Sequence, residues 1–173
     1  MADSNITKRA LANALKEQLM IEPFAKISIA EICQRCDMNR KSFYYHFRDK
    51  YDLMNWIYDT EFIAVAKEKI YDDSWEFMRD MSIYFYENRA FYRRALEVKG
   101  QNSFTEHFQE FLEPVLSQRL RESFHDDRTH SFQVTFFTDA IISALQRWIL
   151  DKEAMPPEEF VGQLKLCLAG IAE

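Results

Sequence analysis

Apolar residues in this chain recur at intervals of three and four positions, which is the spacing of one face of an α-helix. In the first such stretch, residues 5–20, Leu11, Leu15 and Leu19 fall on one side together with small residues. Short polar breaks separate the later stretches. The predicted helices cover approximately residues 5–20, 28–36, 39–47, 50–69, 74–87, 89–97, 103–122, 129–150 and 156–170. We expect Pro114 to kink or break the helix over 103–122. The pattern predicts an all-α fold of about nine helices.

A capping signal marks the start of the helix predicted over residues 28–36. Ser28 is a favoured N-cap residue, and Glu31 stands three positions later, as a capping box requires. Asp37 ends the apolar pattern, and Asp tolerates the left-handed backbone that tight turns often need. We therefore predict a tight turn at Asp37. The apolar face of this helix comprises Ile29, Ile32, Cys33 and Cys36.

A second short helix is predicted directly after that turn. Asn39 is an N-cap type, and Phe43 and Phe47 lie four positions apart on the inward edge. Asp49 is expected to cap the following helix, which begins at Lys50. Two helices joined by about three or four residues have the spacing of a helix-turn-helix.

The outward edge of this second helix combines basic and phenolic side chains. Arg40 and Lys41 occupy its first turn, from which the base edges of DNA are usually contacted. The next turn supplies donors for phosphate oxygens, and Lys50 is expected to hold a further phosphate together with nearby helix N-termini. The candidate DNA-binding residues are Ser28, Asn39, Arg40, Lys41, Ser42, Tyr44, Tyr45, His46 and Lys50.

Residues 28–53 resemble the DNA-binding segment of the tetracycline-repressor (TetR) family of bacterial regulators. The similarity is strongest over residues 42–53, which look like that family's recognition helix and the start of its fourth helix. The family usually has Ala where Cys33 and Cys36 stand, and Gly where Asp37 stands. Cys is a small apolar substitute and Asp can adopt the turn, so these departures leave the resemblance intact.

The resemblance implies an architecture and a mode of action. A helix-turn-helix domain over residues 1–49 would precede a regulatory and dimerisation domain over residues 50–173. A homodimer would bind a palindromic double-stranded DNA operator, and a small ligand or a partner protein would control the affinity. Helix 50–69 would transmit the change. A repressor is expected, although the sequence does not determine the sign of regulation.

A subgroup is also indicated. Residues 91–98 and the aromatic-rich second half look like the regulators of dihydroxyacetone kinase operons. This similarity keeps open an alternative in which only a protein partner controls the regulator. A helical ligand carrier or enzyme without DNA binding is a less favoured alternative.

Composition and charge restrict the possible functions. The 173 residues carry a net charge of −6, but residues 1–53 hold nine Lys/Arg against seven Asp/Glu. A positive local field is what phosphate binding requires, and the acidic remainder suppresses unspecific binding. The sequence shows no apolar run long enough for a membrane helix and no secretory signal at its start, so we expect a cytoplasmic protein without membrane contact.

Candidate metal and catalytic groups give weak signals. Cys33 and Cys36 have a metal-like or redox-like spacing, but no second pair completes a zinc site, so core packing is favoured over redox sensing. His107 with Glu106 or Glu110 offers too few ligands, and the cluster His125, Asp126, Asp127 and His130 is hydrophilic and loop-like. No catalytic or phosphate-loop motif is present. We therefore expect no metal, no cofactor and no enzymatic activity.

Two further sets of residues are candidates in the C-terminal part. An aromatic ligand pocket is expected from the resemblance, although a filled core is the favoured interpretation for any single aromatic. Its candidate residues are Trp75, Met78, Met81, Phe85, Phe104, His107, Phe108, Phe111 and Phe137. The last two helices each carry a second apolar stripe, which indicates a four-helix dimer interface rather than a thick monomeric core. Its candidate residues are Phe136, Ala140, Ser143, Arg147, Phe160, Leu164, Cys167, Leu168 and Ile171.

Overall fold

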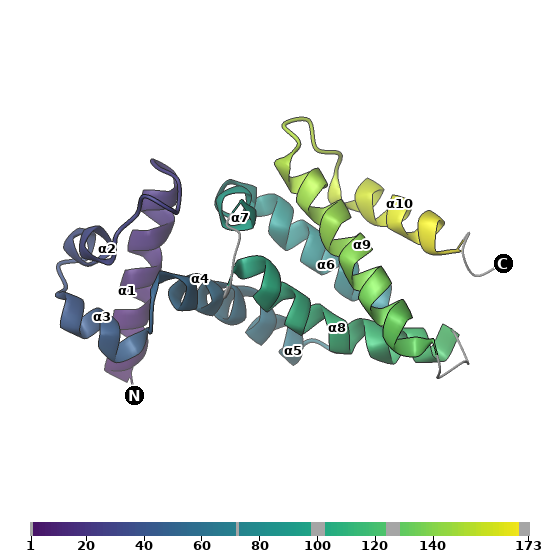
Figure 1. Ribbon diagram of the computed structural model, residues 1–173, viewed down its shortest axis with the longest axis horizontal. Helices are drawn as coiled ribbons and strands as arrows, with labels where there is room; N and C mark the ends of the chain where they lie inside the picture. The colour runs from purple at the N-terminus through teal and green to yellow at the C-terminus, as the bar shows by residue number, and fades with distance from the viewer. Residues whose placement is uncertain (1, 72, 98–102, 124–128, 170–173) are drawn as a thin grey trace. The chain divides into compact units, whose positions relative to one another are not determined.

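The computed structural model describes residues 2–71, 73–97, 103–123 and 129–169, and these residues form helices and connecting segments without strands (Figure 1). The all-α prediction is confirmed, and most helix ends lie within one or two residues of their expected positions. The elements are α1 (Ala2–Leu19), α2 (Ile29–Arg35), α3 (Arg40–His46), α4 (Lys50–Tyr58), a π-helical turn (Asp59–Ile63), α5 (Ala64–Glu68), α6 (Ser74–Glu87), α7 (Arg89–Leu96), α8 (Phe104–Ser123), α9 (His130–Leu150) and α10 (Pro157–Ala169).

The chain forms two compact units. The first comprises Met1–Glu68 and Ala90–Phe104, and the second comprises Lys69–Arg89 and Thr105–Glu173. The first unit therefore contains α4 and most of α7 in addition to the three N-terminal helices. The functional division expected at residues 49 and 50 stays a prediction.

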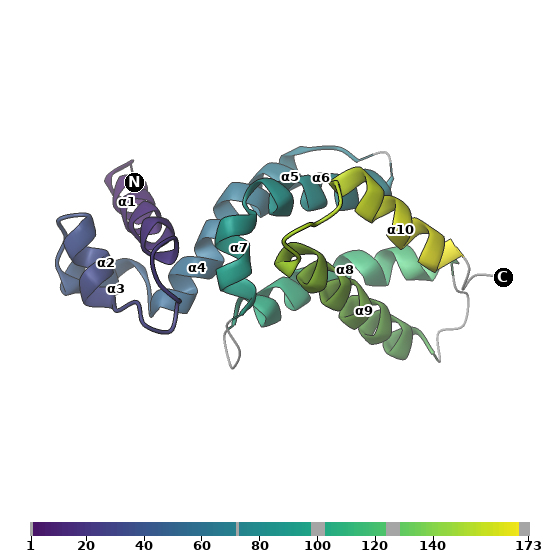
Figure 2. The ribbon, with the colours of Figure 1, turned by 90° about the horizontal axis from the view of Figure 1, so that it is seen from above.

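The core of the first unit lies around α1. Leu11, Leu15 and Leu19 are fully buried, as their shared helical face predicted. Ile32 from α2 and Phe43 from α3 are fully buried as well. Helix α1 packs against α2, α3 and α4, and Figure 2 shows α2 and α3 beside it. This packing gives α3 a fixed support and leaves its opposite side exposed.

The long helix expected over residues 50–69 is interrupted by the π-helical turn. A π turn bonds each carbonyl to the N–H five residues later and occurs mostly as a single turn inside an α-helix. Tyr58 and Phe62 stack across this turn, with ring centroids 5.5 Å apart. Glu61 forms an ion pair with Lys16 of α1. The expected number of helices is recovered when α4, the π turn and α5 count as one.

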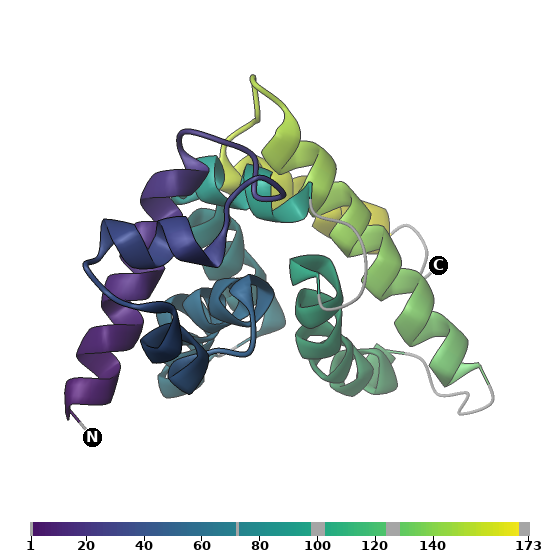
Figure 3. The ribbon, with the colours of Figure 1, turned by 60° about the vertical axis from the view of Figure 1, so that its left-hand side comes forward.

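The second unit is built around α9, which runs uninterrupted in Figure 3. Phe137, Ile141 and Leu145 on one side of α9 are buried. Trp148 on the same side stacks on Phe160 of α10, with ring centroids 4.2 Å apart, and its indole N–H donates to the Met155 carbonyl. Helices α6 and α10 pack against each other. One side of α9 is therefore buried within the second unit.

Helix α8 continues through Pro114, so the helix break that the sequence led us to expect there does not occur. Proline removes the hydrogen bond to the carbonyl four residues earlier, which belongs to Glu110. Both Pro114 and Glu110 are exposed, so water can hydrate the freed carbonyl. The helix therefore tolerates a proline that a buried position would not.

Candidate nucleic-acid interface

The helix-turn-helix is held by the local hydrogen bonds that the sequence predicted. The Ser28 hydroxyl accepts from the Glu31 backbone N–H at 3.2 Å, and Glu31 Oε2 accepts from the Ser28 N–H at 2.7 Å. The Asn39 side chain accepts from the Ser42 N–H at 2.9 Å. Asp37 has a φ of 55°, the left-handed conformation expected at the turn. The caps and the turn are therefore confirmed.

Replacement of Ser28 by Ala should lower the free energy of unfolding of the first unit by about 1 kcal/mol, the usual cost of a lost N-cap. The pKa of Glu31 is held below its usual value by its hydrogen bonds with Ser28. Such a carboxylate stabilises the fold above its unfolded-state pKa and loses this effect as pH falls through the lower folded-state pKa. Urea denaturation at pH 7 and at decreasing pH should show the Ser28→Ala difference shrinking in acid. An unchanged difference across that range would contradict the capping box.

The rear of α3 is anchored by two aromatic residues. Phe43 is fully buried and Phe47 nearly so, and their ring centroids lie 5.8 Å apart. Phe47 also meets Trp56 of α4 edge-on at 5.7 Å. The ammonium of Lys8 lies 5.6 Å from the Phe47 ring centroid. The inward edge predicted for this helix is confirmed, and it fixes the direction in which the opposite side chains point.

The exposed face of α3 gathers cationic and phenolic groups. Arg40 and Lys41 are exposed, and Tyr45 is 82% exposed. Arg40 Nη2 donates to the Tyr44 hydroxyl at 3.4 Å, and this hydrogen bond is the main cause that raises the pKa of Arg40. The Tyr45 and His46 rings meet edge-on at 4.9 Å. A helix face with these groups matches what DNA phosphates and base edges require.

Lys50 lies beside backbone carbonyls in this structure, and the phosphate contact expected for it stays a prediction. Its ammonium donates to the carbonyl oxygens of Phe24 and Ile27, each at 2.7 Å, and to that of Ala25 at 3.3 Å. The three bonds occupy all three N–H donors of a lysine. Burial lowers the pKa of Lys50, although Glu22 and Glu31 oppose the shift. Sequence reasoning placed Lys50 correctly at the start of a helix but could not show which groups surround it.

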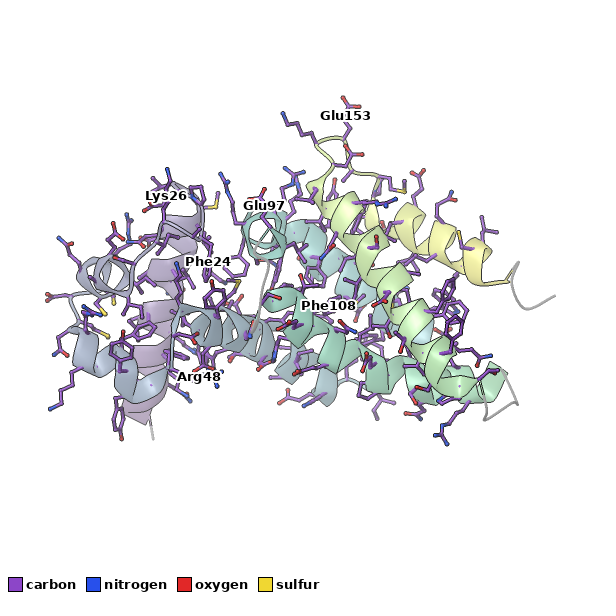
Figure 4. The ribbon with its side chains drawn as sticks, viewed as in Figure 1. Phe24, Lys26, Arg48, Glu97, Phe108 and Glu153 are labelled. Carbon is purple, nitrogen blue, oxygen red and sulfur yellow. The ribbon has the colours of Figure 1, made fainter. Side chains whose placement is uncertain are left out.

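Arg48 is a cation that the sequence analysis did not include among the candidates. It lies between α3 and α4 with an exposed side chain (Figure 4), and its backbone N–H donates to Asp52 Oδ2 at 2.9 Å. Its guanidinium Nε is 3.9 Å from Asp49 Oδ2, a contact that solvent weakens. The sequence signal that could have identified Arg48 was a basic residue two positions after the end of α3.

The stripe expected to form a dimer interface on α9 is exposed. Phe136 is 52% exposed and its ring stacks with that of Phe132, which is 74% exposed. Ala140, Ser143 and Arg147 continue this exposed side. These five residues of α9 are called the exposed α9 stripe below.

The α10 candidates for the dimer interface differ from one another in how exposed their side chains are. Phe160 is buried inside its own unit against Trp148, so it is not available to a partner. From the sequence, the place of Phe160 on the apolar stripe could not show whether its side chain faces its own unit or a partner chain. Leu164 is partly exposed and Cys167 is exposed. The side chain of Leu168 and all of Ile171 lie outside the described residues.

The residues expected to line a ligand pocket are divided between the two units. Phe104 packs against Tyr58 and Tyr92 in the first unit, at 5.3 and 5.2 Å between ring centroids. Phe108 packs against Phe85 in the second unit at 5.4 Å. Met78, Met81 and Phe137 are also buried, whereas Trp75, His107 and Phe111 are partly exposed. These contacts are those of packed aromatic cores, and the pocket stays a prediction.

The structure describes only some of the candidate metal ligands and the cysteines Cys33 and Cys36. No group of three or more His, Cys, Asp or Glu residues that could hold a metal ion occurs in the described part of the chain. His125, Asp126 and Asp127 lie outside the described residues. Cys33 is buried, and burial is the main cause that raises the pKa of both the Cys33 and the Cys36 thiol. A raised pKa disfavours the reactive thiolate, which agrees with a packing role.

A recognition helix with a buried aromatic rear and an exposed cationic and phenolic face defines a DNA-binding regulator of the helix-turn-helix class. Residues 11–56 match the profile of the bacterial regulatory proteins of the tetR family, and residues 72–170 match the transcriptional regulator C-terminal region TetR_C_8. The chain belongs to the TetR family of transcriptional regulators, as its sequence predicted. Members of this family regulate transcription, so the protein is not an enzyme.

A relative with an assigned role has a similar amino-acid sequence. The HTH-type dhaKLM operon transcriptional activator DhaS of Lactococcus lactis subsp. lactis (strain IL1403) is 24% identical over 154 residues, which cover 85% of this chain and 81% of that protein. This similarity confirms the expected likeness to regulators of dihydroxyacetone kinase operons.

Two solved structures share the fold. That of the dihydroxyacetone kinase operon activator DhaS has a TM-score of 0.68 at 23% identity and covers 96% of both chains. That of a TetR transcriptional regulator from Streptococcus agalactiae 2603V has a TM-score of 0.78 at 23% identity and covers 98% of this chain and 96% of that chain. Within the described residues of this protein, no helix is both long and apolar enough to span a membrane.

Proposed function

We propose that this regulator binds a palindromic operator as a homodimer and that α3 enters the major groove in each half-site. The observation that carries the proposal is the exposed face of α3, where Arg40 and Lys41 stand in the first turn. Arg40 and Lys41 would contact bases, and Tyr44, Tyr45 and His46 would contact phosphates. Asn39 and Ser42 would hold the start of α3 through their own hydrogen bond.

The exposed α9 stripe supports the homodimer. An aromatic and small-residue stripe along one long helix is poorly matched to water, whereas a second copy of the same helix would cover it. A two-fold dimer also meets the symmetry of a palindromic operator. The second unit of each chain would thus hold the two recognition helices at one half-site spacing.

Substitution of Arg40 or Lys41 by Ala tests the DNA face. Each change should cost about 1–3 kcal/mol of operator affinity and relax the preference at one base pair, if the side chain reads a base. The operator duplex can be recovered by selection from a random library with the full-length protein, and affinities can be measured by fluorescence anisotropy at several salt concentrations. Lys152→Ala, an exposed lysine after α9, is the matched control and should leave the affinity unchanged. Equal affinities for all three variants and the parent would refute this face.

We further propose control by a small ligand or a partner protein, acting on a cytoplasmic protein with access to chromosomal DNA. The DhaS relative and the DhaS structure are both named as activators, which supports activation rather than the repression expected from the sequence. Run-off transcription with and without the protein decides the sign. A partner is indicated if a protein fraction of the host cells changes operator affinity while the small-molecule filtrate does not, and a ligand if the reverse holds.

A further inference from the structure

Arg40 and Tyr44 lie one helical turn apart on the exposed face of α3 and contact each other, and they are called the Arg40–Tyr44 pair below. Nη2 of Arg40 donates to the Tyr44 hydroxyl at 3.4 Å, and the guanidinium carbon lies 5.9 Å from the centroid of the Tyr44 ring. Both contacts restrict the same end of the Arg40 side chain. The guanidinium is therefore held beside the next turn of the helix before any DNA is bound.

The Tyr44 ring is itself supported by the core of the first unit. It meets the ring of Phe43 edge-on, with ring centroids 5.6 Å apart, and Phe43 is fully buried. Tyr44 is 51% exposed, so about half of its surface stays open to a ligand. A short chain of contacts thus runs from the buried Phe43 through Tyr44 to the guanidinium of Arg40.

The Arg40–Tyr44 pair keeps enough hydrogen-bond donors for a base and a phosphate. A guanidinium has five N–H donors, and the bond to Tyr44 uses one of them. Two of the others suffice to bind N7 and O6 of a guanine. The Tyr44 hydroxyl accepts from Arg40 through its oxygen, so its own hydrogen can be donated to a phosphate oxygen. One phenol can thereby connect a base-reading side chain to the DNA backbone.

This restraint matters because arginine is a long and flexible side chain. Immobilising such a side chain at an interface lowers affinity by about two- to tenfold, and a side chain that is already held avoids part of this cost. A hydrogen bond of 3.4 Å is weak in water, but it is strengthened when binding removes water from around it. A restrained guanidinium also favours one arrangement of base acceptors over the others.

We propose that Tyr44 is a positioning residue for Arg40, which holds the guanidinium ready to bind a guanine in each half-site and so determines the preference at that base pair. The inference rests on the proposed operator binding and names the base that this part of α3 reads. Tyr44 acts on the base through Arg40, in addition to its own contact with a phosphate.

Tyr44→Phe tests the positioning role, because it removes the hydroxyl and keeps the ring. Single base-pair substitutions in the selected operator, measured with Arg40→Ala, locate the guanine whose preference Arg40 sets. Tyr44→Phe should lower operator affinity by about three- to tenfold, the scale of one hydrogen bond, and weaken the preference at that base pair only. In the Arg40→Ala background, Tyr44→Phe should weaken this preference no further. Fluorescence anisotropy measures all of these affinities.

The matched control is Tyr45→Phe, which removes the hydroxyl of the neighbouring phenol, whose ring contacts His46. Loss of that hydroxyl should lower the affinities for the operator and for a mixed-sequence duplex by the same factor. The same parallel loss in Tyr44→Phe, with the base preference intact, would overturn the positioning role and leave a plain phosphate contact. An Arg40→Ala protein with the parent preference at every base pair would overturn it as well.

A measurement without DNA separates failure of the positioning role from failure of operator binding. In the parent protein, NMR should show slower rotation of the Arg40 guanidinium than in Tyr44→Phe, because the hydroxyl holds one of its amino groups. Equal rotation rates in these two proteins would refute the positioning role even if the operator is bound. Slow rotation in a parent protein that binds no duplex would refute operator binding and leave the Arg40–Tyr44 pair in place. Tyr45→Phe should show the parent rotation rate.

Discussion

Phe136→Glu is expected to convert the protein to a monomer and to reduce operator affinity by about 10²- to 10⁴-fold, the gain that joining two binding sites usually gives. Phe136 belongs to the exposed α9 stripe and stacks with Phe132. In a two-fold dimer, each chain would bury this carboxylate against apolar groups without a partner for it, which is strongly unfavourable. Each monomer could then occupy only one half-site. Sedimentation velocity measures the dimer, and anisotropy with the operator duplex measures the affinity.

Ile70→Glu is the matched control for this change. Ile70 is 91% exposed and lies between α5 and α6, away from the α9 stripe in the sequence. The same charge placed there should leave both the dimer and the operator affinity intact. A Phe136→Glu variant that remains dimeric at micromolar concentration would show that another surface joins the chains. A monomeric variant with parent affinity would show that the operator is not bound by a dimer.

Phe43→Ala should lower the free energy of unfolding of the first unit by about 3–5 kcal/mol, the cost of removing a buried phenyl ring and leaving a cavity. Phe43 is fully buried behind α3 and contacts the rings of Tyr44 and Phe47. Since small domains are stable by only about 5–15 kcal/mol, this loss is a large share of the total and should shift unfolding to clearly lower urea concentration. Urea denaturation followed by circular dichroism measures the change.

Tyr45→Ala, on the same helix, should leave the stability nearly unchanged and weaken operator binding. Tyr45 is 82% exposed, so its loss should change the free energy of unfolding by less than about 0.5 kcal/mol. Its operator affinity should nevertheless fall, because the phenol is proposed to donate to a phosphate. A Phe43→Ala variant as stable as Tyr45→Ala would mean that the rear of α3 is not packed as described.

Local chemistry made the helix-turn-helix predictable. Ser28, Asn39 and Asp49 cap helices through bonds to backbone groups only two or three residues away, so the sequence alone specifies them. Asp37 adopts its left-handed conformation for an equally local reason. The inward position of Phe43 follows from helical spacing. These features place α3 and orient its exposed face before any tertiary contact is known.

Spacing alone did not distinguish contacts made across the fold. Phe160 shares an apolar stripe with residues expected at a dimer interface, but it stacks on Trp148 within its own unit. Phe104 and Phe108 lie one helical turn apart, yet they pack in different units. A helical period identifies an apolar face but not the surface that covers it.

The sequence by itself determined the all-helical fold, the caps, the turn and the chemistry displayed by α3, because each depends on residues a few positions apart. Only the tertiary structure decided the environment of Lys50. The carbonyls that bind its ammonium come from residues 24, 25 and 27, more than twenty positions earlier in the chain. A charged side chain has no preference between phosphate and carbonyl oxygen until folding brings one of them within reach, and here folding brings the carbonyls.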